Sequence, residues 1–318
     1  MKNLKSPLLA FILVLPVLLA GCQVPPAANT AVSDKNTAAE SLLSVYTSFY
    51  PMYDFAVKIG GGQVIVNNLV PAGTEPHDWE PTATDIVNLE NADIFIYNGA
   101  GMENWVQDVL DTIENKDLIT VEASQGIPLL ADSEAGGGTT ERGGLYDPHV
   151  WLNPLYAQKE MEQIKQAFSL ADPEHQAYYE ANYEHYVTEL AKLDQEYKDT
   201  LSPLANKDII VAHQAFGYLC SAYGLNQIPI EGLSADSEPD PARMADIINY
   251  AHEHQIKVIF FEELVSPKVA EIIAAAIGAK TEVLNPLEGL NDEQKAAGAD
   301  YFSVMRQNLA TLKEALQT

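Results

Sequence analysis

The chain has 318 residues, of which 47% are hydrophobic, and its 45 acidic and 18 basic residues give a net charge of −27. A surface this acidic repels nucleic acid and anionic lipid headgroups, so we expect no nucleic-acid partner. It raises the local concentration of cations, although this general field does not by itself make a binding site. The apolar content beyond the first 40 residues is sufficient for one large core or two ordinary ones.

The first residues have the pattern of an export signal. Lys2 and Lys5 precede an apolar run over 8–19 that is too short to span a bilayer. The four residues Leu-Ala-Gly-Cys that end at Cys22 resemble the lipobox of bacterial lipoproteins, in which this cysteine is lipidated and becomes the first mature residue. We therefore expect a lipoprotein signal peptide over 1–21 and a lipid anchor on Cys22, with an ordinary secretory signal as the alternative.

The next residues, 22–41, are rich in Pro, Ala, Asn, Thr and Ser and have no apolar period, which predicts a flexible tether. Beyond it, short apolar runs alternate with helical segments in two halves of the chain, a pattern typical of βαβ units and mainly parallel sheets. The expected strands are 43–49, 64–70, 94–98, 118–122, 208–212, 227–231, 258–262 and 282–284. The expected helices are 52–59, 84–91, 103–113, 215–223, 241–254, 267–277 and 299–316.

Between the halves lies a long segment without an internal Pro or Gly. Asp172 is expected as its N-cap and Pro173 as its first helical residue, with the helix continuing to about Leu201. At 1.5 Å per residue its roughly 28 residues give a rod about 42 Å long, which could run along both halves and oppose a wide hinge motion. One apolar stripe at spacings of three and four follows it: Tyr183, Tyr186, Leu190, Leu193, Tyr197 and Leu201. The predicted division is an N-terminal α/β domain over 42–160, a linking helical segment over 161–203 and a C-terminal α/β domain over 204–318.

Three histidines stand singly near the ends of expected strands or in turns: His77, His149 and His213. An isolated histidine is usually a turn or core residue, but three in such similar settings favour a metal site. Imidazoles on distant loops can converge on one cation, usually zinc, once the fold assembles them. In open parallel sheets, ligands bind at the carboxyl ends of the strands, so we expect these side chains in a common cleft between the halves.

A tetrahedral zinc site needs a fourth donor, and the second half of the chain offers two acidic candidates at strand ends. They are Glu262 and Glu288, and their positions alone do not distinguish them. Glu262 could equally cap the helix that follows it.

Four segments carry a close resemblance to a known family. They are 71–81 (PAGTEPHDWEP), 97–101 (YNGAG), 147–152 (DPHVWL) and 212–218 (AHQAFGY). They resemble the solute-binding components of zinc/manganese ABC importers, and the similarity extends from about residue 44 onward. The resemblance implies two Rossmann-like domains with mainly parallel sheets, joined by a long backbone helix, with the metal in the interdomain cleft. The metal ligands that it implies are His77, His149, His213 and Glu288.

The third of these ligands separates zinc members of the family from manganese members, which resemble one another in having a carboxylate there. His213 occupies that position here, and three nitrogens with one carboxylate suit Zn²⁺, whereas Mn²⁺ prefers more oxygen ligands and a higher coordination number. Many zinc members also have a long His-rich loop before the second histidine. The corresponding loop over 132–144 contains no histidine, so a role for it in gathering metal is not expected.

The resemblance implies a monomeric extracytoplasmic lipoprotein, anchored to the bacterial membrane, that captures Zn²⁺ and delivers it to an ABC importer permease. Enzymatic activity is not expected, because four protein ligands would leave no coordination position for a reactive water. The alternatives are a manganese-specific member of the same family, a secreted zinc-dependent hydrolase and a surface adhesin. The hydrolase lacks support, because the chain has no His-Glu-x-x-His or Gly-x-Ser-x-Gly motif.

Overall fold

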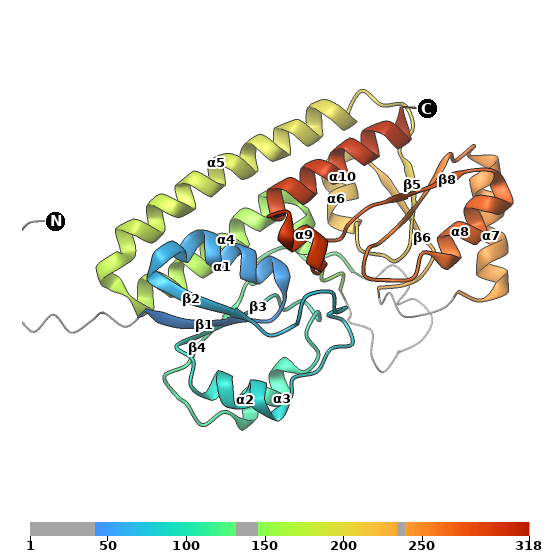
Figure 1. Cartoon of the computed structure of the whole chain (residues 1–318). Helices are drawn as coiled ribbons and strands as arrows, with labels where there is room; N and C mark the ends of the chain where they lie inside the picture. Colours follow the sequence, from blue (N-terminus) through green and yellow to red (C-terminus); the bar gives the residue numbers. More distant parts are fainter. Residues whose placement is uncertain (1–41, 132–145, 234–238, 318) are drawn as a thin grey trace, which may run out of the picture. The chain divides into compact units, whose positions relative to one another are not determined.

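Two four-stranded sheets form the framework of the computed structural model, which describes residues 42–131, 146–233 and 239–317 (Figure 1). The predicted signal peptide, Cys22, the tether and the loop over 132–144 lie outside the described residues. The first sheet has the order β2-β1-β3-β4 and the second the order β6-β5-β7-β8, and all neighbouring strands in both are parallel. The strands are β1 (Leu43–Thr47), β2 (Val64–Asn68), β3 (Ile94–Tyr97), β4 (Ile119–Glu122), β5 (Asp208–Val211), β6 (Asn226–Pro229), β7 (Val258–Phe261) and β8 (Lys280–Val283).

Helices cover both faces of each sheet, as short parallel strands joined by crossover helices require. The α-helices are α1 (Tyr50–Gly60), α2 (Ala83–Glu90), α3 (Val106–Thr112), α4 (Pro154–Ala171), α5 (Gln176–Leu201), α6 (Gly217–Tyr223), α7 (Pro241–Glu253), α8 (Lys268–Ile277), α9 (Asp292–Ala296) and α10 (Tyr301–Leu316). Three short 3₁₀ turns accompany them: η1 (Gly61–Gln63), η2 (Val150–Leu152) and η3 (Pro173–His175). The predicted α/β fold with two mainly parallel sheets is confirmed. We call the part built on the first sheet the N-terminal lobe and the part built on the second the C-terminal lobe.

The segment between the two sheets contains two α-helices, α4 and α5, and the predicted start of the longer one, α5, is wrong. The long helix begins at Gln176 and not at Pro173, because Pro173–His175 forms a 3₁₀ turn. The Asp172 carboxylate does not cap a first helical turn. Its Oδ2 accepts hydrogen bonds from the Tyr179 hydroxyl at 2.8 Å and from His175 Nδ1 at 2.7 Å, which holds the tight connection between the two helices.

Helix α4 was not predicted as a separate helix, and only its part from residue 161 onward falls within the predicted linking helical segment, although its sequence carries the signals of a helix. Asn153 accepts a hydrogen bond from the Leu155 N–H as an N-cap, and Pro154 occupies the first turn. Its buried residues recur at spacings of three and four. The short helix α9 was not predicted either. Since Ser41–Thr318 forms one compact unit, the domain boundaries at residues 160 and 203 stay predictions.

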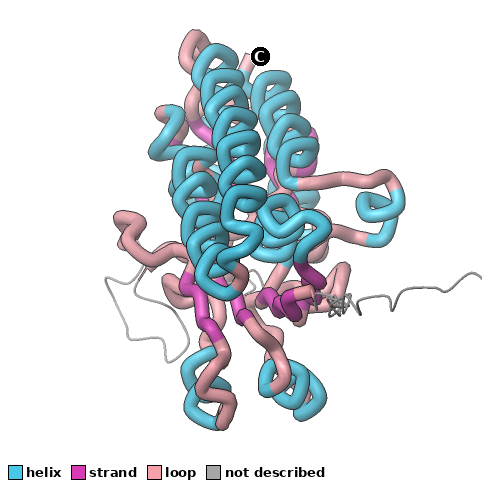
Figure 2. The backbone as a smooth tube through the Cα atoms, turned by 90° about the vertical axis from the view of Figure 1, so that its left-hand side faces the viewer, coloured by secondary structure: helices cyan, strands magenta, loops and turns pink. Residues whose placement is uncertain are grey.

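Helix α5 runs along both lobes, as predicted for the linking rod (Figure 1). It contacts α1 and α4 of the N-terminal lobe as well as α6 and α10 of the C-terminal lobe. Its stripe is buried at Leu190, Leu193, Tyr197 and Leu201. Figure 2 shows the long helices packed side by side, with the C-terminus at the end of one of them.

One hydrophobic core continues from the first sheet through α4, α5 and α10 to the second sheet. Two smaller cores lie on the opposite sheet faces, one under α2 and α3 and the other under α7 and α8. The shared core and α5 together make the junction between the lobes a packed region. Within the described ranges, no helix is long and apolar enough to cross a membrane.

Candidate metal centre

His77 lies on the loop that follows β2. The turn before it contains Gly73 with a φ of +73°, a conformation that favours glycine, and the Gly73 N–H donates to the Leu290 carbonyl at 3.2 Å. Both carboxylate oxygens of Glu75 lie 3.1 Å from the His77 N–H. The His77 side chain is 10% exposed, so it is the ligand candidate nearest to solvent.

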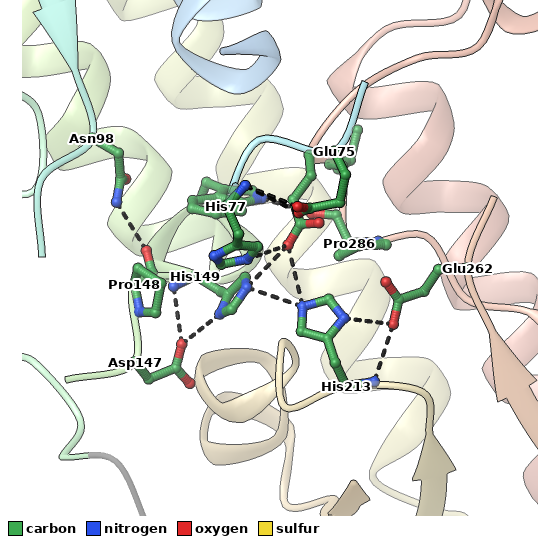
Figure 3. Close-up of polar contacts among 12 residues, drawn as sticks. Glu75, His77, Asn98, Asp147, Pro148, His149, His213, Glu262 and Pro286 are labelled. Atoms are coloured by element: carbon green, nitrogen blue, oxygen red, sulfur yellow. Dashed lines mark hydrogen bonds and ion pairs between the residues drawn. The ribbon is translucent and has the colours of Figure 1, made fainter. Parts of the chain in front are cut away.

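His149 is completely buried between Asp147 and the turn η2. Asp147 Oδ1 accepts hydrogen bonds from the His149 N–H at 2.9 Å and from the ring Nδ1 at 2.8 Å. A carboxylate can only accept, so Nδ1 carries a proton toward Asp147, and this hydrogen bond directs Nε2 into the site. Asn98 supports the same segment, since its Nδ2 donates to the Pro148 carbonyl at 3.0 Å (Figure 3).

His213 follows β5 and has an equivalent arrangement in the C-terminal lobe. The side chain is completely buried, and its Nδ1 lies 2.8 Å from Glu262 Oε1, which also accepts the His213 N–H at 3.3 Å (Figure 3). Glu262 therefore contacts the ring nitrogen on the side away from the other histidines and holds Nε2 toward them. It caps no helix: α8 begins after Pro267 without a side-chain cap, so that alternative is wrong.

Glu288 follows β8 and lies between the three imidazoles. Its Oε1 is 3.0 Å from His149 Nε2, 3.3 Å from His213 Nε2 and 3.3 Å from His77 Nε2. The Nε2 atoms of His149 and His213 are 3.3 Å apart, and all four ligand atoms lie within 4.8 Å of one another. Four atoms bound tetrahedrally to zinc at about 2.0–2.1 Å would be about 3.3 Å apart, so four of the six distances in this cluster are already close to those of a zinc site.

The carboxylates around this cluster favour protonation of its buried imidazoles. Burial disfavours protonation of His213, but the carboxylates of Glu262 and Glu288 outweigh it and raise the His213 pKa well above its usual range. Burial also opposes protonation of His149, but hydrogen bonds from its ring to the carboxylates of Asp147 and Glu288 outweigh this and raise its pKa. Burial alone would raise the Glu288 pKa, but the imidazoles of His213 and His77 hold it well below the usual value. A metal cation that binds here must displace protons.

The structure therefore brings together His77, His149, His213 and Glu288, and it places Glu262 beside His213 outside this group. Cys22 lies outside the described residues. Sequence reasoning missed the ring contact of Asp147, although this residue stands two positions before His149. It also missed the side chains that hold the Glu288 loop, among them Asn308 and Trp151, which lie 23 and 135 residues away from the loop residues that they bind.

The fold and the cluster together define a two-lobed parallel α/β protein with a buried site of three imidazoles and one carboxylate. Residues 45–315 match the model of the family described as ZnuA, zinc-uptake complex component A, periplasmic. The chain belongs to this family.

Three relatives illustrate the match. The high-affinity zinc uptake system protein ZnuA of Bacillus subtilis is 44% identical over 306 residues, which cover 94% of this chain and 96% of the relative. The zinc-binding lipoprotein AdcA of Streptococcus pneumoniae is 39% identical over 87% of this chain, which spans only 56% of AdcA. The crystal structure of the Zn(II)-bound ZnuA-like domain of AdcA superposes with a TM-score of 0.76 at 39% identity, covering 87% of this chain and 100% of that domain. The laminin-binding protein Lmb of Streptococcus agalactiae, described as bifunctional in adhesion and metal transport, has a TM-score of 0.78 at 31% identity and covers 86% of this chain and 99% of Lmb.

Proposed function

We propose that this protein captures Zn²⁺ outside the cytoplasm and delivers it to the membrane permease of an ABC importer. The ligands in this proposal are His77 Nε2, His149 Nε2, His213 Nε2 and one carboxylate oxygen of Glu288. The observation that carries the proposal is the spacing of these four atoms: four of the six distances between them are 3.0–3.3 Å, close to the tetrahedral value, and all lie within 4.8 Å. The zinc-bound and zinc-uptake relatives support the same cargo.

The donor set favours zinc over manganese. Three imidazoles and one carboxylate match a tetrahedral Zn²⁺ site, whereas Mn²⁺ prefers more oxygen donors in a larger shell. Three of the four ligand candidates are buried, which leaves little room for the water molecules that would complete a six-coordinate ion. Competition between the two metals is the direct test of this preference.

On capture, Zn²⁺ would exchange its bound water molecules for protein ligands, and the imidazoles would release their Nε2 protons. Asp147 and Glu262 hold Nδ1 of His149 and His213, so both rings present Nε2 to the incoming cation. Glu288 supplies the negative charge that partly neutralises it. A shell of four protein ligands has no exchangeable position for a reactive water, so we propose a binding protein and not a zinc hydrolase.

Membrane attachment and adhesion remain further parts of the proposal. We propose lipidation at Cys22 with residues 22–41 as the tether, supported by the lipobox-like sequence and by the lipoprotein AdcA among the relatives. The likeness to Lmb is the observation that favours an additional adhesin role. Binding of the purified protein to immobilised laminin, with and without zinc, would test that role separately.

The proposed cargo is tested on protein purified without added metal. Elemental analysis should find one zinc per chain, and excess Mn²⁺ should not displace it during dialysis. A chain that retains manganese, or that binds either metal equally, would contradict the zinc assignment.

A further inference from the structure

The backbone just before Glu288 has an unusual conformation. Leu287 has a φ of +63°, in the left-handed region that residues with a side chain rarely adopt. Its side chain is completely buried in the core shared by both lobes, so a glycine here would lose that packing. Residues persist in this conformation only where surrounding contacts enforce it, and they gather at ligand-binding sites.

Buried side chains bind the backbone of all three residues that precede the carboxylate ligand. Asn285 Oδ1 accepts the Leu287 N–H at 2.6 Å. Asn308 of α10 forms a reciprocal pair with the Asn285 backbone: its Oδ1 accepts the N–H at 2.9 Å and its Nδ2 donates to the carbonyl at 2.7 Å. The Trp151 indole Nε1 donates to the Pro286 carbonyl at 2.7 Å. Together, these hydrogen bonds hold the backbone of residues 285–287 in the left-handed turn.

The same helix also reaches the segment that carries His149. The Tyr301 hydroxyl, in the first turn of α10, donates to the Trp151 carbonyl at 2.7 Å. The Trp151 ring packs against His149 with ring centroids 5.3 Å apart. Helix α10 thus holds two ligand-bearing segments from different lobes, one through Asn308 and the other through Tyr301.

We propose that Asn285 and Asn308 are positioning residues that hold Leu287 in the left-handed conformation and so fix one oxygen of Glu288 opposite the three imidazoles. A rigid carboxylate at this distance favours a tetrahedral ion and opposes the larger shell of Mn²⁺. The arrangement therefore increases both zinc affinity and selectivity for zinc over manganese. This inference rests on the proposed function, because it concerns the same site.

The first test uses two isomeric substitutions in the chain from Ser41 onward, which forms one compact unit. Leu287→Ile keeps the hydrophobic volume but adds a β-branch that the left-handed region excludes. Leu284→Ile is the matched control, because Leu284 is also completely buried but follows a strand where β-branching is tolerated. We expect Leu287→Ile to weaken zinc binding by about 10-fold or more, and Leu284→Ile to change it by less than about threefold.

The second test removes the side chain that holds the loop. Asn308→Leu should lower zinc affinity by about 10- to 100-fold, as the loss of an outer-shell contact typically does. It should also weaken the visible absorption of bound Co²⁺, which is intense only in tetrahedral sites. Amide hydrogen exchange at Leu287 in the metal-free protein should become faster. Gln307→Leu, an exposed neighbour on the same helix, is the control for helix packing.

Circular dichroism and thermal unfolding identify any variant that does not fold, and the remaining variant then decides the outcome. Wild-type zinc affinity, Co²⁺ spectrum and zinc-to-manganese ratio in folded Leu287→Ile or Asn308→Leu would overturn the positioning role while leaving the zinc site intact. A wild-type chain that does not bind zinc would overturn the proposed function itself.

Discussion

The three histidines of the site differ in how firmly they are held. His149 and His213 are completely buried, and each ring is fixed by a carboxylate 2.8 Å from its Nδ1. His77 is partly exposed and lies on a loop tied to the rest of the chain by the hydrogen bond from Gly73 to Leu290. The two buried rings therefore form the preorganised part of the site.

Removal of one imidazole should remove one of four ligands. We predict that His77→Ala, His149→Ala and His213→Ala each weaken zinc binding by more than about 100-fold, which exceeds the usual effect of an outer-shell change. His185→Ala, on the exposed face of α5, should leave affinity unchanged. Isothermal titration with a competing chelator measures this, and native affinity and stoichiometry in His149→Ala would show that the ligand set is wrong.

The two acidic residues near the site should behave differently. Glu288→Ala opens the fourth coordination position, so zinc should bind more weakly and bound Co²⁺ should show a changed visible spectrum. Glu262→Gln keeps an oxygen that can accept the hydrogen bond from His213 Nδ1 but removes the negative charge. We therefore expect a smaller loss of zinc affinity, about 10-fold, with one zinc still bound. The reverse order of effects in folded protein would move the ligand assignment to Glu262.

Among the elements, α4 carries a buried carboxyl group away from the metal site. Glu160 is completely buried, and neither of its oxygens has a hydrogen-bond partner among the described residues. Burial, with a smaller contribution from Glu103, raises the Glu160 pKa well above its usual value. In the folded chain, the Glu160 carboxyl group thus keeps its proton up to a higher pH than in the unfolded chain.

This proton makes the stability of the protein depend on pH. Because the folded pKa is raised, the contribution of Glu160 is fully present below its unfolded pKa near 4.5 and is lost as the pH rises toward the folded value. Glu160→Gln should therefore gain stability relative to wild type between pH 5 and pH 8, by about 1.4 kcal/mol or more. Glu162→Gln on the same helix is the control, and urea unfolding at both pH values is the measurement. Parallel pH profiles for wild type and Glu160→Gln would contradict this assignment.

At the scale of the whole compact unit, α5 and the shared core limit relative motion of the lobes. The 26 residues of α5 contain neither Gly nor Pro, and the helix packs on α1, α4, α6 and α10. Lys58 of α1 adds a partly buried connection to the N-cap residue of α10, since its Nζ lies 3.0 Å from Asp300 and 2.8 Å from Asp54. Hinge closure needs residues that absorb large backbone changes, and this junction provides none within the helix.

We therefore predict that zinc leaves the dimensions of the chain from Ser41 onward nearly unchanged while it raises the melting temperature by mass action. Removal of zinc with a chelator should lower the melting temperature and leave the radius of gyration within error. Small-angle scattering and calorimetry of both states measure this. A clear decrease in the radius of gyration on zinc addition would mean that the lobes close as a clamshell.

The sequence alone determined the features that depend on local patterns. The predicted strand segments overlap all eight strands of the described residues, most closely the central ones such as β3 and β7, because buried parallel strands are hydrophobic over most of their length. The edge strands β6 and β8 are at least half polar, and their predicted bounds were shifted by one or two residues. The α-helical start at Pro173 was wrong by three residues, because Pro173–His175 forms a 3₁₀ turn that leads directly into α5, as is common at helix N-termini. The placement of His77, His149 and His213 near strand ends predicted that they converge, since parallel sheets gather these ends on one edge.

The family resemblance implied Glu288, but only the tertiary structure shows why this carboxylate, and not that of Glu262, faces the three imidazoles. Glu262 and Glu288 both follow strands of the second sheet, and their local sequence settings gave no reason to prefer one. The difference comes from the Glu288 loop, which Asn308 and Trp151 hold from 23 and 135 residues away along the chain, while Glu262 is bonded to the outer nitrogen of His213. Such contacts form between residues distant in sequence, so no local period or spacing can encode them.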